Sequence, residues 1–342
     1  MSNILKILAE LGHRVTFIGE NFNQFEPYDS IMQQAGVEVI FSPFIRSIEQ
    51  YISQNGQYFD VVMLSRLHIA QKHLSNIRKY CPTAKVVFDT VDLQFLRESR
   101  RAKVKNDPVL LKKADELKKM EIHLAKSSDI TIVVSTKEYE ILKSEDPSLN
   151  VQIISLIHEL KNPDKTFSER RDLLFLGAFL HNPNVDGIIW FIQEIFPKIK
   201  QKIPDIKLFV VGDRPTKELL AFSSEDFIVT GYVEDLIDYF NDCRVFVAPL
   251  RYGAGVKGKI NQSMSYGLPV ITTHIGAEGM GLTDEHNILI ADDPDTFAKK
   301  VILLYQDEEL WNKISINSIE HIRQNFSYEI SKNRIKQFID SL

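Results

Sequence analysis

A regular alternation of short apolar runs with helix-like stretches is the feature that most constrains the fold of this chain. Runs such as DLLFLGA (172–178) and VFVAPL (245–250) contain almost no polar residues, as strands covered on both faces do. Stretches with helical periodicity, such as residues 67–80 and 294–306, separate these runs. This alternation predicts an α/β protein built on parallel sheets with helices on both faces.

The alternation is interrupted once, by the polar segment HELKNPDKTFSERR (158–171), which contains Pro163. We interpret it as a linker, so that residues 1–160 and 171–325 form two Rossmann-like domains and residues 326–342 form a final helix. Two such domains predict a cleft between them, with ligands beyond the carboxyl ends of the strands.

The first domain begins in an unusual way. An amphipathic helix with Ile4, Leu8 and Leu11 on one side leads directly into the strand RVTFIG (14–19). A helix followed by a parallel strand usually completes a strand–helix–strand unit. We therefore expect the first domain to lack its first strand, unless another segment supplies it.

Composition excludes several classes of protein. The 342 residues carry a net charge of −5, which argues against nucleic acid as a partner. Cys81 and Cys243 form no C-x-x-C pair, and we find no signal peptide and no apolar run near the length that spans a bilayer, which favours a cytoplasmic protein. Neither H-E-x-x-H, nor a P-loop, nor a first-strand GxGxxG occurs, so we expect no metal ion and no cofactor.

A glycine-rich loop follows VFVAPL, in the segment RYGAGVKGKINQSMSYGLPVI (251–271). Gly253 and Gly255 precede a helix expected to start near residues 256–258. Such a loop at a strand's carboxyl end offers free N–H groups and a helix dipole to a phosphate group. Lys257 and Lys259 add positive charge in the first turn, although a simple loop with solvated lysines gives the same pattern.

Other loops of the second half should meet at the same edge. A glycine near nearly every strand end favours a nucleotide-sized ligand, although such loops are often rich in glycine. These loops are residues 177–184, 212–214, 231–234 and 274–281.

Charged residues at strand ends of the first half are candidates for binding sugar hydroxyls or an acceptor. Helix capping, surface charge and a structural histidine are equally plain explanations. A further stretch, residues 97–126, has ten Lys/Arg and five Asp/Glu; peripheral membrane contact is one interpretation, and a solvated helix face is the one we favour. The strand-end candidates are His68, Asp89, Asp92, Arg97, Arg100 and Arg101.

Several segments resemble the group 1 (family 4) glycosyltransferases with the GT-B fold. They are DLLFLGAFLHNPNVDGIIWFIQEIFPKI, KLFVVGD, VTGYVEDL, VFVAPLRYGAGVKGKINQSMSYGLPVITTHIGAEGMG and NILIADDPDTFA, with a looser likeness in LGHRVTFIGENFN and FDTVDLQFLRESRRA. The resemblance implies a retaining, metal-independent hexosyltransferase. It further implies that residues 171–325 bind a nucleotide-sugar donor, that the acceptor (a glycan, lipid-linked or protein) enters from residues 1–160, and that residues 326–342 cross back to that domain.

The resemblance also assigns roles to single residues. The family's Glu-x7-Glu motif falls on Ala254 and Gln262, so both glutamates are absent, and the usual Arg/Lys pair has no counterpart in residues 177–184. We expect Gln262 to bind the ribose, and Glu278 and Asp92 to act at the sugar and the acceptor. The other donor-site candidates are Tyr232, Val233, Arg251, Gly255, Lys257, Lys259, Gly276, Ala277 and Gly279, and those on the acceptor side are His68, Asp89 and Arg97.

Two other functions remain open. A non-catalytic GT-B subunit or truncated relative that binds a partner transferase would explain the absent glutamates and the absent first strand. An epimerase of the same fold acting on a nucleotide-sugar is a weaker alternative, because the first domain shows no obvious acid–base pair.

Overall fold

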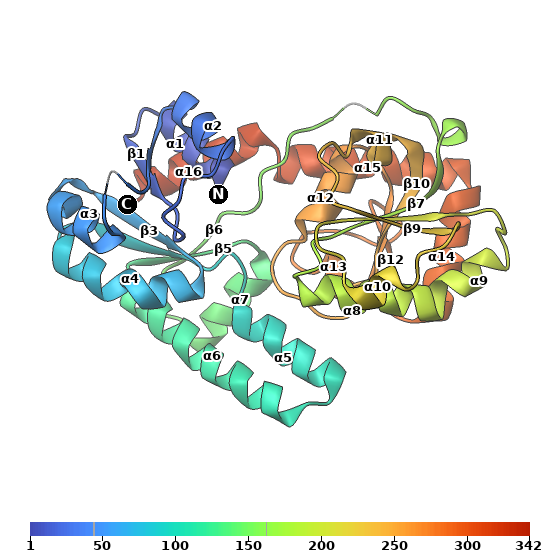
Figure 1. The fold of residues 1–342 in the computed structure, drawn as a ribbon, viewed down its shortest axis with the longest axis horizontal. Coiled ribbons are helices and arrows are strands. Elements are labelled where there is room, and N and C mark those ends of the chain that lie inside the picture. The colour runs from blue at the N-terminus through green and yellow to red at the C-terminus, as the bar shows by residue number, and fades with distance from the viewer. Residues whose placement is uncertain (44, 162) are drawn as a thin grey trace. The chain divides into compact units, whose positions relative to one another are not determined.

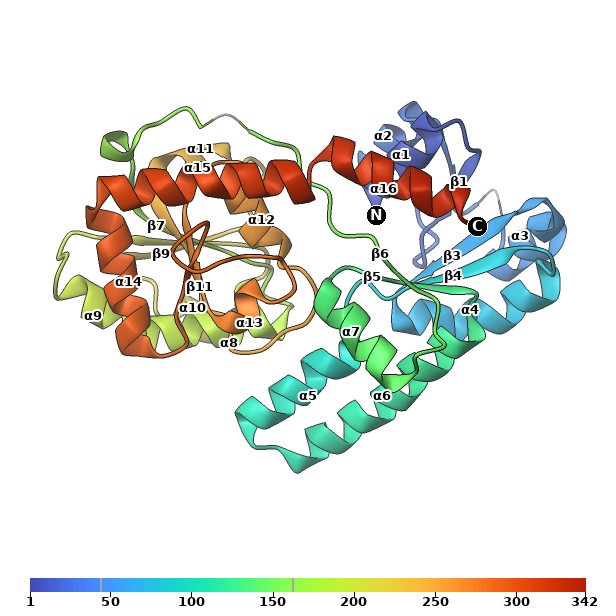
Figure 2. The same ribbon diagram turned by 180° about the vertical axis from the view of Figure 1, so that it is seen from behind.

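The computed structural model describes residues 1–43, 45–161 and 163–342, and it has the predicted α/β class with parallel sheets (Figures 1 and 2). The chain divides into two compact units, each with its own sheet system. Unit 1 comprises Met1–Phe95, Asp115–Ile157 and Tyr328–Leu342, and unit 2 comprises Leu96–Ala114 and His158–Ser327.

Unit 2 contains a six-stranded parallel sheet in the order β12-β11-β10-β7-β8-β9. Its strands are β7 (Arg171–Leu176), β8 (Leu208–Val211), β9 (Phe227–Gly231), β10 (Cys243–Ala248), β11 (Val270–Thr272) and β12 (Leu289–Ile290). Its helices are α8 (Asn182–Trp190), α9 (Phe196–Lys200), α10 (Lys217–Leu220), α11 (Ile237–Asp242), α12 (Gly258–Ser265), α13 (His274–Ala277), α14 (Pro294–Gln306) and α15 (Glu308–Asn325), with a 3-10 turn at Phe167–Glu169 and a π-helical segment at Phe191–Ile195.

Apolar clusters cover both faces of this sheet, which explains why its strands are apolar on both sides. Along β10, Val245 and Val247 pack in a cluster with α8 and α14, whereas Phe246 and Ala248 pack in a cluster with α11 and α12. In Figure 1 the sheet of unit 2 lies between these two layers of helices. Side chains of successive strand residues point to opposite faces, so each strand contributes to both clusters.

Unit 1 has its sheet in two parts: β1 pairs with β2, and β3, β4, β5 and β6 pair in that order. The interruption falls where the sequence predicted a missing strand. The strands are β1 (Val15–Ile18), β2 (Val37–Ile40), β3 (Val61–Ser65), β4 (Lys85–Asp89), β5 (Ile130–Val133) and β6 (Val151–Ile153). The helices are α1 (Ser2–Glu10), α2 (Tyr28–Gln34), α3 (Ile48–Asn55), α4 (Leu67–Tyr80), α5 (Gln94–Lys105), α6 (Pro108–Ser127), α7 (Thr136–Glu145) and α16 (Tyr328–Asp340), with a 3-10 turn at Gly56–Tyr58; parts of α5 and α6 belong to unit 2.

The last helix, α16, packs beside the first, α1, within unit 1 (Figure 1). Ile335 and Phe338 join Ile7 in one buried cluster. On the outside, Glu10 accepts hydrogen bonds from the Tyr328 hydroxyl at 2.7 Å and the Lys332 amine at 2.6 Å. Contacts between the two ends of the chain therefore stabilise this part of unit 1.

The helical region predicted from about residue 95 to 126 is broken near Asp107-Pro108, as expected. Asn106 has a φ of 50°, which ends α5, and the Asp107 carboxylate accepts hydrogen bonds from the Val109 and Leu110 amides at the start of α6. An aspartate before a helix satisfies amides that have no partner within the helix. The result is a helical hairpin whose turn lies in unit 2 (Figure 2).

Candidate functional site

The glycine-rich loop connects β10 to α12, and α12 begins at Gly258, as the sequence predicted. Gly255 adopts a φ of 65°, a conformation that residues with a Cβ rarely take. Ile260 and Met264 are fully buried and fix the inner side of the helix. The amino end of α12, with no side-chain cap, is therefore presented beside the loop.

Lys259, in the first turn of α12, directs its amine toward residues of β7 and α8. The Nζ atom donates a hydrogen bond of 2.6 Å to Asn184 Oδ1 and lies 4.4 Å from the centre of the Phe175 ring. The residue as a whole is partly exposed, but the amine lies among protein atoms. Burial, with a smaller effect from the charge of Lys257, lowers the pKa of Lys259 to about 7.

Lys257 is also buried, with 9% of its surface exposed, and its amine donates a hydrogen bond of 2.5 Å to the Gly255 carbonyl. The Lys257 amine thus lies at the glycine-rich loop, and the Lys259 amine lies at the first turn of α8. A neutral amide oxygen accepts the hydrogen bond from Lys259, so an anion bound here would add a stronger electrostatic partner to that amine.

Asn184 links this loop to the one after β7. Its Nδ2 donates to the Ala178 carbonyl at 2.8 Å while its Oδ1 accepts from Lys259. The side chain also packs on Gly177, where an added Cβ would come within 2.7 Å of Asn184. From the sequence, Asn184 was predicted only as part of the loop 177–184. Its position as a polar residue in the first turn of α8 was the signal that could have singled it out.

Arg251 is bound by an acid that the sequence analysis did not name. Its Nε and Nη2 atoms donate to the two Asp186 oxygens at 2.8 and 2.6 Å. This two-pronged ion pair compensates the arginine charge and ties the glycine loop to α8.

Arg100, on α5, clamps two loops of unit 2 together. Its guanidinium donates to the Gly253 carbonyl at 2.8 Å and forms a two-pronged ion pair with Glu278 at 2.6 and 2.8 Å. Glu278 directly follows α13, so the arginine fixes the glycine loop relative to the Gly276–Gly279 loop. Arg100 was noted in the sequence among strand-end charges, but its partners were not foreseeable.

The remaining donor-site candidates differ in how far they are exposed to solvent. Tyr232 is 69% exposed and follows Gly231 at the end of β9, whereas Val233 packs against a core cluster. Gln262 lies partly exposed on α12. Gly276 and Ala277 are buried in α13, and Gly279 has a φ of 72°.

Candidates of unit 1 gather where β3 and β4 end. Asp89 is buried, its Oδ2 accepts from the Ser65 hydroxyl at 2.7 Å, and its Oδ1 accepts from the Val91 amide at 3.1 Å. Burial raises the pKa of Asp89. His68 is exposed at the start of α4, and Asp92 is partly exposed after β4.

Unit 1 also contains a contact between a carboxylate and a histidine that is not apparent from the sequence. Glu20, just past β1, accepts from Lys72 at 2.5 Å and lies 3.0 Å from His73 Nε2, both on α4. Desolvation opposes ionisation of Glu20, but the hydrogen bonds from Lys72 and His73 outweigh it and lower the pKa. Arg97, which belongs to unit 2, lies 3.3 Å from its neighbour Glu98.

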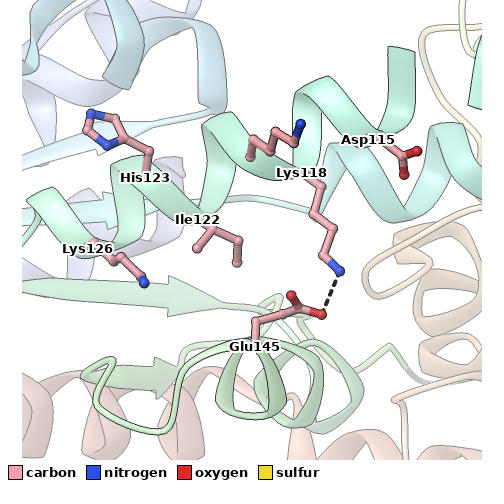
Figure 3. Close-up of a pocket in the computed structure, with 7 residues that line it drawn as sticks. Asp115, Lys118, Ile122, His123, Lys126 and Glu145 are labelled. Carbon is pink, nitrogen blue, oxygen red and sulfur yellow. Dashed lines mark ion pairs between the residues drawn. The ribbon is translucent and has the colours of Figure 1, made fainter. Parts of the chain in front are cut away.

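An open hollow of about 590 Å³ lies on unit 1 between α6 and α7. Figure 3 shows Lys118 reaching from α6 to Glu145 on α7, an ion pair of 2.6 Å, while His123 points away from that pair. Lys126 also lines the hollow and binds Asp146 at 2.8 Å. The basic residues here are largely compensated, and none of the donor candidates lies among its lining residues.

Across residues 1–43, 45–161 and 163–342, no group of three or more His, Cys, Asp or Glu side chains has the geometry of a metal site. Over the same residues, no helix combines the length and apolar character needed to cross a bilayer.

Comparison with solved structures identifies the fold class. Sucrose-phosphate synthase from Thermosynechococcus elongatus matches over 99% of this chain and 91% of its own, with a TM-score of 0.77 and 15% sequence identity. HepE of Anabaena, in complex with UDP-glucose, matches over 99% of this chain and 95% of its own, with a TM-score of 0.74 and 13% identity. The chain therefore has the GT-B fold of glycosyltransferases, as the resemblance in its sequence implied.

The sequence comparisons then specify the domain in unit 2. Residues 170–307, which lie within unit 2, match the family model "Glycosyl transferases group 1". A 44.6 kDa protein from the cps region of Klebsiella pneumoniae is 30% identical over 51% of this chain and 47% of its own length. YtcC of Bacillus subtilis, named as a glycosyltransferase, is 25% identical over 51% of this chain and 46% of its own. The chain thus spans about half the length of the curated relatives it matches.

The lowered pKa of Lys259 predicts a pH-dependent effect on stability. The folded protein loses this proton near pH 7, whereas an unfolded lysine keeps it to about pH 10. Between these values the unfolded state binds one more proton, so rising pH stabilises the wild type through this group. Relative to wild type, Lys259→Met should therefore be about 2–3 kcal/mol more stable at pH 6 than at pH 9.

Urea denaturation at the two pH values measures this difference. Lys198→Met is the matched control, because Lys198 is an exposed lysine paired with Asp295. The control should give the same change at both pH values. An equal change at both values for Lys259→Met would show that its amine is not destabilised by burial.

Proposed function

We propose that this chain is a glycosyltransferase that moves a sugar, with retention of configuration, from a nucleotide-sugar bound by unit 2 to an acceptor. One observation carries the proposal: the buried Lys257 and the partly buried Lys259 stand on either side of the uncapped start of α12, at the end of one glycine-rich loop. Anions bind at helix starts because free N–H groups and the helix dipole favour negative charge. The diphosphate of the donor is the group that fits this chemistry.

The lysines would act on the leaving group. When the bond between the anomeric carbon and the phosphate oxygen breaks, negative charge accumulates on the diphosphate. Fixed cations and N–H donors at that position stabilise the charge without a metal ion. Because Lys259 has a pKa near 7, diphosphate binding should also draw a proton onto its amine.

The rest of the donor would extend along the carboxyl edge of the sheet. In the order β10-β7-β8-β9, the loop at β10 and Tyr232 after β9 lie three strand spacings apart, about 14 Å. This span supports an extended ligand, with its base near Tyr232 and Val233 and its ribose near Gln262. Ala254 has no functional group to offer the sugar.

The chemical step needs no protein base in this proposal. The acceptor hydroxyl attacks the anomeric carbon on the face from which the diphosphate leaves, and the departing phosphate oxygen takes the acceptor's proton. Glu278, bound by Arg100, would orient the loop next to the sugar. Asp89, Asp92 and His68 of unit 1 would serve the acceptor, a glycan, a lipid-linked sugar or a protein.

Two structural neighbours support uridine diphosphate as the nucleotide. HepE was solved with UDP and glucose and with UDP-glucose, and TarM was solved with UDP. We therefore infer a UDP-sugar as the donor of this chain.

UDP should raise the thermal unfolding midpoint of the wild-type protein. At 100 times the dissociation constant, the gain is about 2.7 kcal/mol, or roughly 4 °C for a protein of this size. The double variant Lys257→Ala, Lys259→Ala should lose the shift, while Lys198→Ala keeps it. Calorimetry in buffers of different ionisation enthalpy should show uptake of about one proton at pH 8 and almost none at pH 6, because Lys259 is neutral only above its pKa.

A second function is favoured by the two absent glutamates and by the interrupted sheet of unit 1. In that case the chain would be a non-catalytic subunit that binds a partner transferase. Release of UDP from UDP-sugars, with a panel of sugar acceptors, separates the two: a chain that binds UDP but releases none from any donor is the non-catalytic subunit.

Arg100 should act as a positioning residue for turnover. Arg100→Lys keeps the charge but loses the two-pronged grip on Glu278 and Gly253, so we expect kcat to fall about 10- to 100-fold. UDP affinity should change little, because Lys257 and Lys259 remain. Glu278→Gln should reproduce the kcat loss, and Lys103→Gln, an exposed change on the same helix, should not. An unchanged kcat in Arg100→Lys contradicts this role.

The turn between α5 and α6 supports a peripheral membrane contact. Val109 and Leu111 are 62% and 39% exposed there, among exposed lysines. Apolar tips within a basic surface bind anionic lipid headgroups. The protein should sediment with vesicles of phosphatidylglycerol more than with phosphatidylcholine, and Val109→Asp should weaken sedimentation at least several-fold. Equal sedimentation of the wild type and Val109→Asp with the two kinds of vesicle would argue against the membrane contact.

A further inference from the structure

Two aromatic side chains of unit 1 stack on each other in an exposed position. Phe25 precedes α2 and Tyr28 begins it, and their rings lie 5.4 Å apart between centres and 8° from parallel. The two residues are 60% and 57% exposed, and Ile31, about one helical turn further on, is 41% exposed. Single exposed apolar residues are common on protein surfaces, but a contiguous group marks a candidate binding surface.

The backbone that carries this aromatic pair is held by its own segment. Asp29 is buried, its Oδ2 accepts a hydrogen bond of 2.6 Å from the Phe25 amide, and its own amide donates to the Phe25 carbonyl at 3.1 Å. Met32 is buried on the inner side of α2, which packs on β2. The backbone is therefore fixed before a ligand arrives, and this lowers the entropy cost of binding.

Exposed side chains with amide and carboxylate groups accompany the aromatic pair. Glu26 stands between the two aromatic residues in the sequence, and its carboxylate accepts hydrogen bonds from Gln24 at 2.8 Å and from Ser30 at 2.7 Å. An amide both donates and accepts hydrogen bonds, and a carboxylate accepts them, so the two groups together suit the hydroxyl groups of a sugar. The exposed amide side chains are those of Asn21, Asn23 and Gln24.

The charge of this segment is negative. No Lys or Arg occurs between Arg14 and Arg46, whereas that stretch contains four acidic residues. Lys72 compensates one of them, Glu20. The remaining negative charge repels anionic lipid headgroups, the phosphates of a lipid-linked sugar and acidic glycans. Among the possible acceptors, an uncharged glycan therefore suits this surface best.

The segment also lies where candidate acceptor residues stand. It begins directly after the carboxyl end of β1, and the Ser42 amide, just past β2, donates to the Phe22 carbonyl at 3.0 Å. Glu20 of the same segment contacts His73 of α4, the helix that follows β3 and carries His68 in its first turn. The aromatic pair and His68 thus lie on segments that leave the same side of unit 1.

We propose that Phe25 and Tyr28 form a subsite for an uncharged sugar unit of a glycan acceptor, whose pyranose ring stacks on the exposed aromatic faces. The C–H groups on one face of a pyranose carry partial positive charge and pack against the negative face of an aromatic ring. The exposed amides and Glu26 bind the hydroxyl groups. The subsite selects the acceptor and takes no part in the chemical step. This inference rests on the proposed transfer to an acceptor and names the class of that acceptor.

Direct binding of neutral oligosaccharides tests the subsite without any sugar transfer. Cellotetraose, maltotetraose and chitotetraose are titrated into the wild-type protein, and saturation-transfer NMR with irradiation of aromatic protons detects sugar protons that touch the rings. At least one of the three should bind. The double variant Phe25→Ala, Tyr28→Ala should raise its dissociation constant about tenfold or more, whereas Tyr28→Phe, which keeps the ring, should stay within about twofold.

Tyr58→Ala is the matched control, because Tyr58 is 74% exposed and precedes β3, away from the carboxyl end of that strand. It should bind the oligosaccharides like the wild type. Binding of none of the three sugars, or an equal loss in Tyr58→Ala and in the double variant, overturns the subsite. Should the double variant unfold, Tyr28→Ala alone replaces it in the comparison.

Two other occupants of the aromatic pair are outcomes of the same set of variants. Dimers of the wild type that the double variant abolishes would assign the pair to a second copy of the chain. Sedimentation with phosphatidylglycerol vesicles that the double variant abolishes would assign it to a membrane. Either result overturns the glycan subsite.

Turnover distinguishes a failure of this subsite from a failure of the proposed function. With an oligosaccharide as acceptor, the double variant should raise the acceptor KM about tenfold and leave kcat and UDP affinity within about twofold, because the rings do not touch the reacting atoms. UDP release with an unchanged acceptor KM in the double variant overturns the subsite and leaves the transfer intact. Ring-dependent binding in a chain that releases no UDP supports the subsite and contradicts the transfer.

Discussion

Direct packing of backbone on backbone at the carboxyl edge of the unit 2 sheet is the constraint on which the candidate site depends. An added Cβ at Gly212 would come within 1.9 Å of the Gly177 carbonyl, and one at Gly187 within 2.4 Å of the Pro249 carbonyl. Only residues without a Cβ allow these loops to approach so closely. The approach brings the loops after β7, β8 and β10 together, and it places α8 beside the glycine-rich loop.

Because these segments lie close together, polar side chains on them can contact one another. Asn184 and Asp186, both on α8, bind Lys259 and Arg251, and Arg100 connects the glycine-rich loop to Glu278. The two arginines are paired with carboxylates, whereas the Lys259 amine contacts a neutral amide oxygen and an aromatic ring. Such an amine gains more from an incoming diphosphate than one already paired with a carboxylate, because binding compensates its unfavourable burial. The low pKa and the proposed role in donor binding are thus two consequences of one arrangement.

In unit 1 the strands of the sheet are buried to different degrees. Its sheet buries β5 fully and all of β4 except Lys85, and it leaves β1 and β3 partly uncovered, while Ile7 of α1 packs with Ile335 and Phe338 of α16. Two carboxylates of this unit stand at the carboxyl ends of strands: Glu20, after β1, contacts His73 of α4, and Asp89, at the end of β4, accepts a hydrogen bond from Ser65.

The sequence by itself determined the parallel α/β fold, the start of α12, the break near Asp107 and the interruption before β1. These features depend on local periodicity, on glycine and proline, and on the rule that a helix joins neighbouring parallel strands. Only the tertiary structure decided which polar groups meet. Asn184 and Lys259 are 75 residues apart, Arg100 and Glu278 are 178 apart, and Glu20 and His73 are 53 apart. No local pattern encodes such pairs, because each depends on how close the loops of separate strands can pack and on the direction each side chain takes from its own helix.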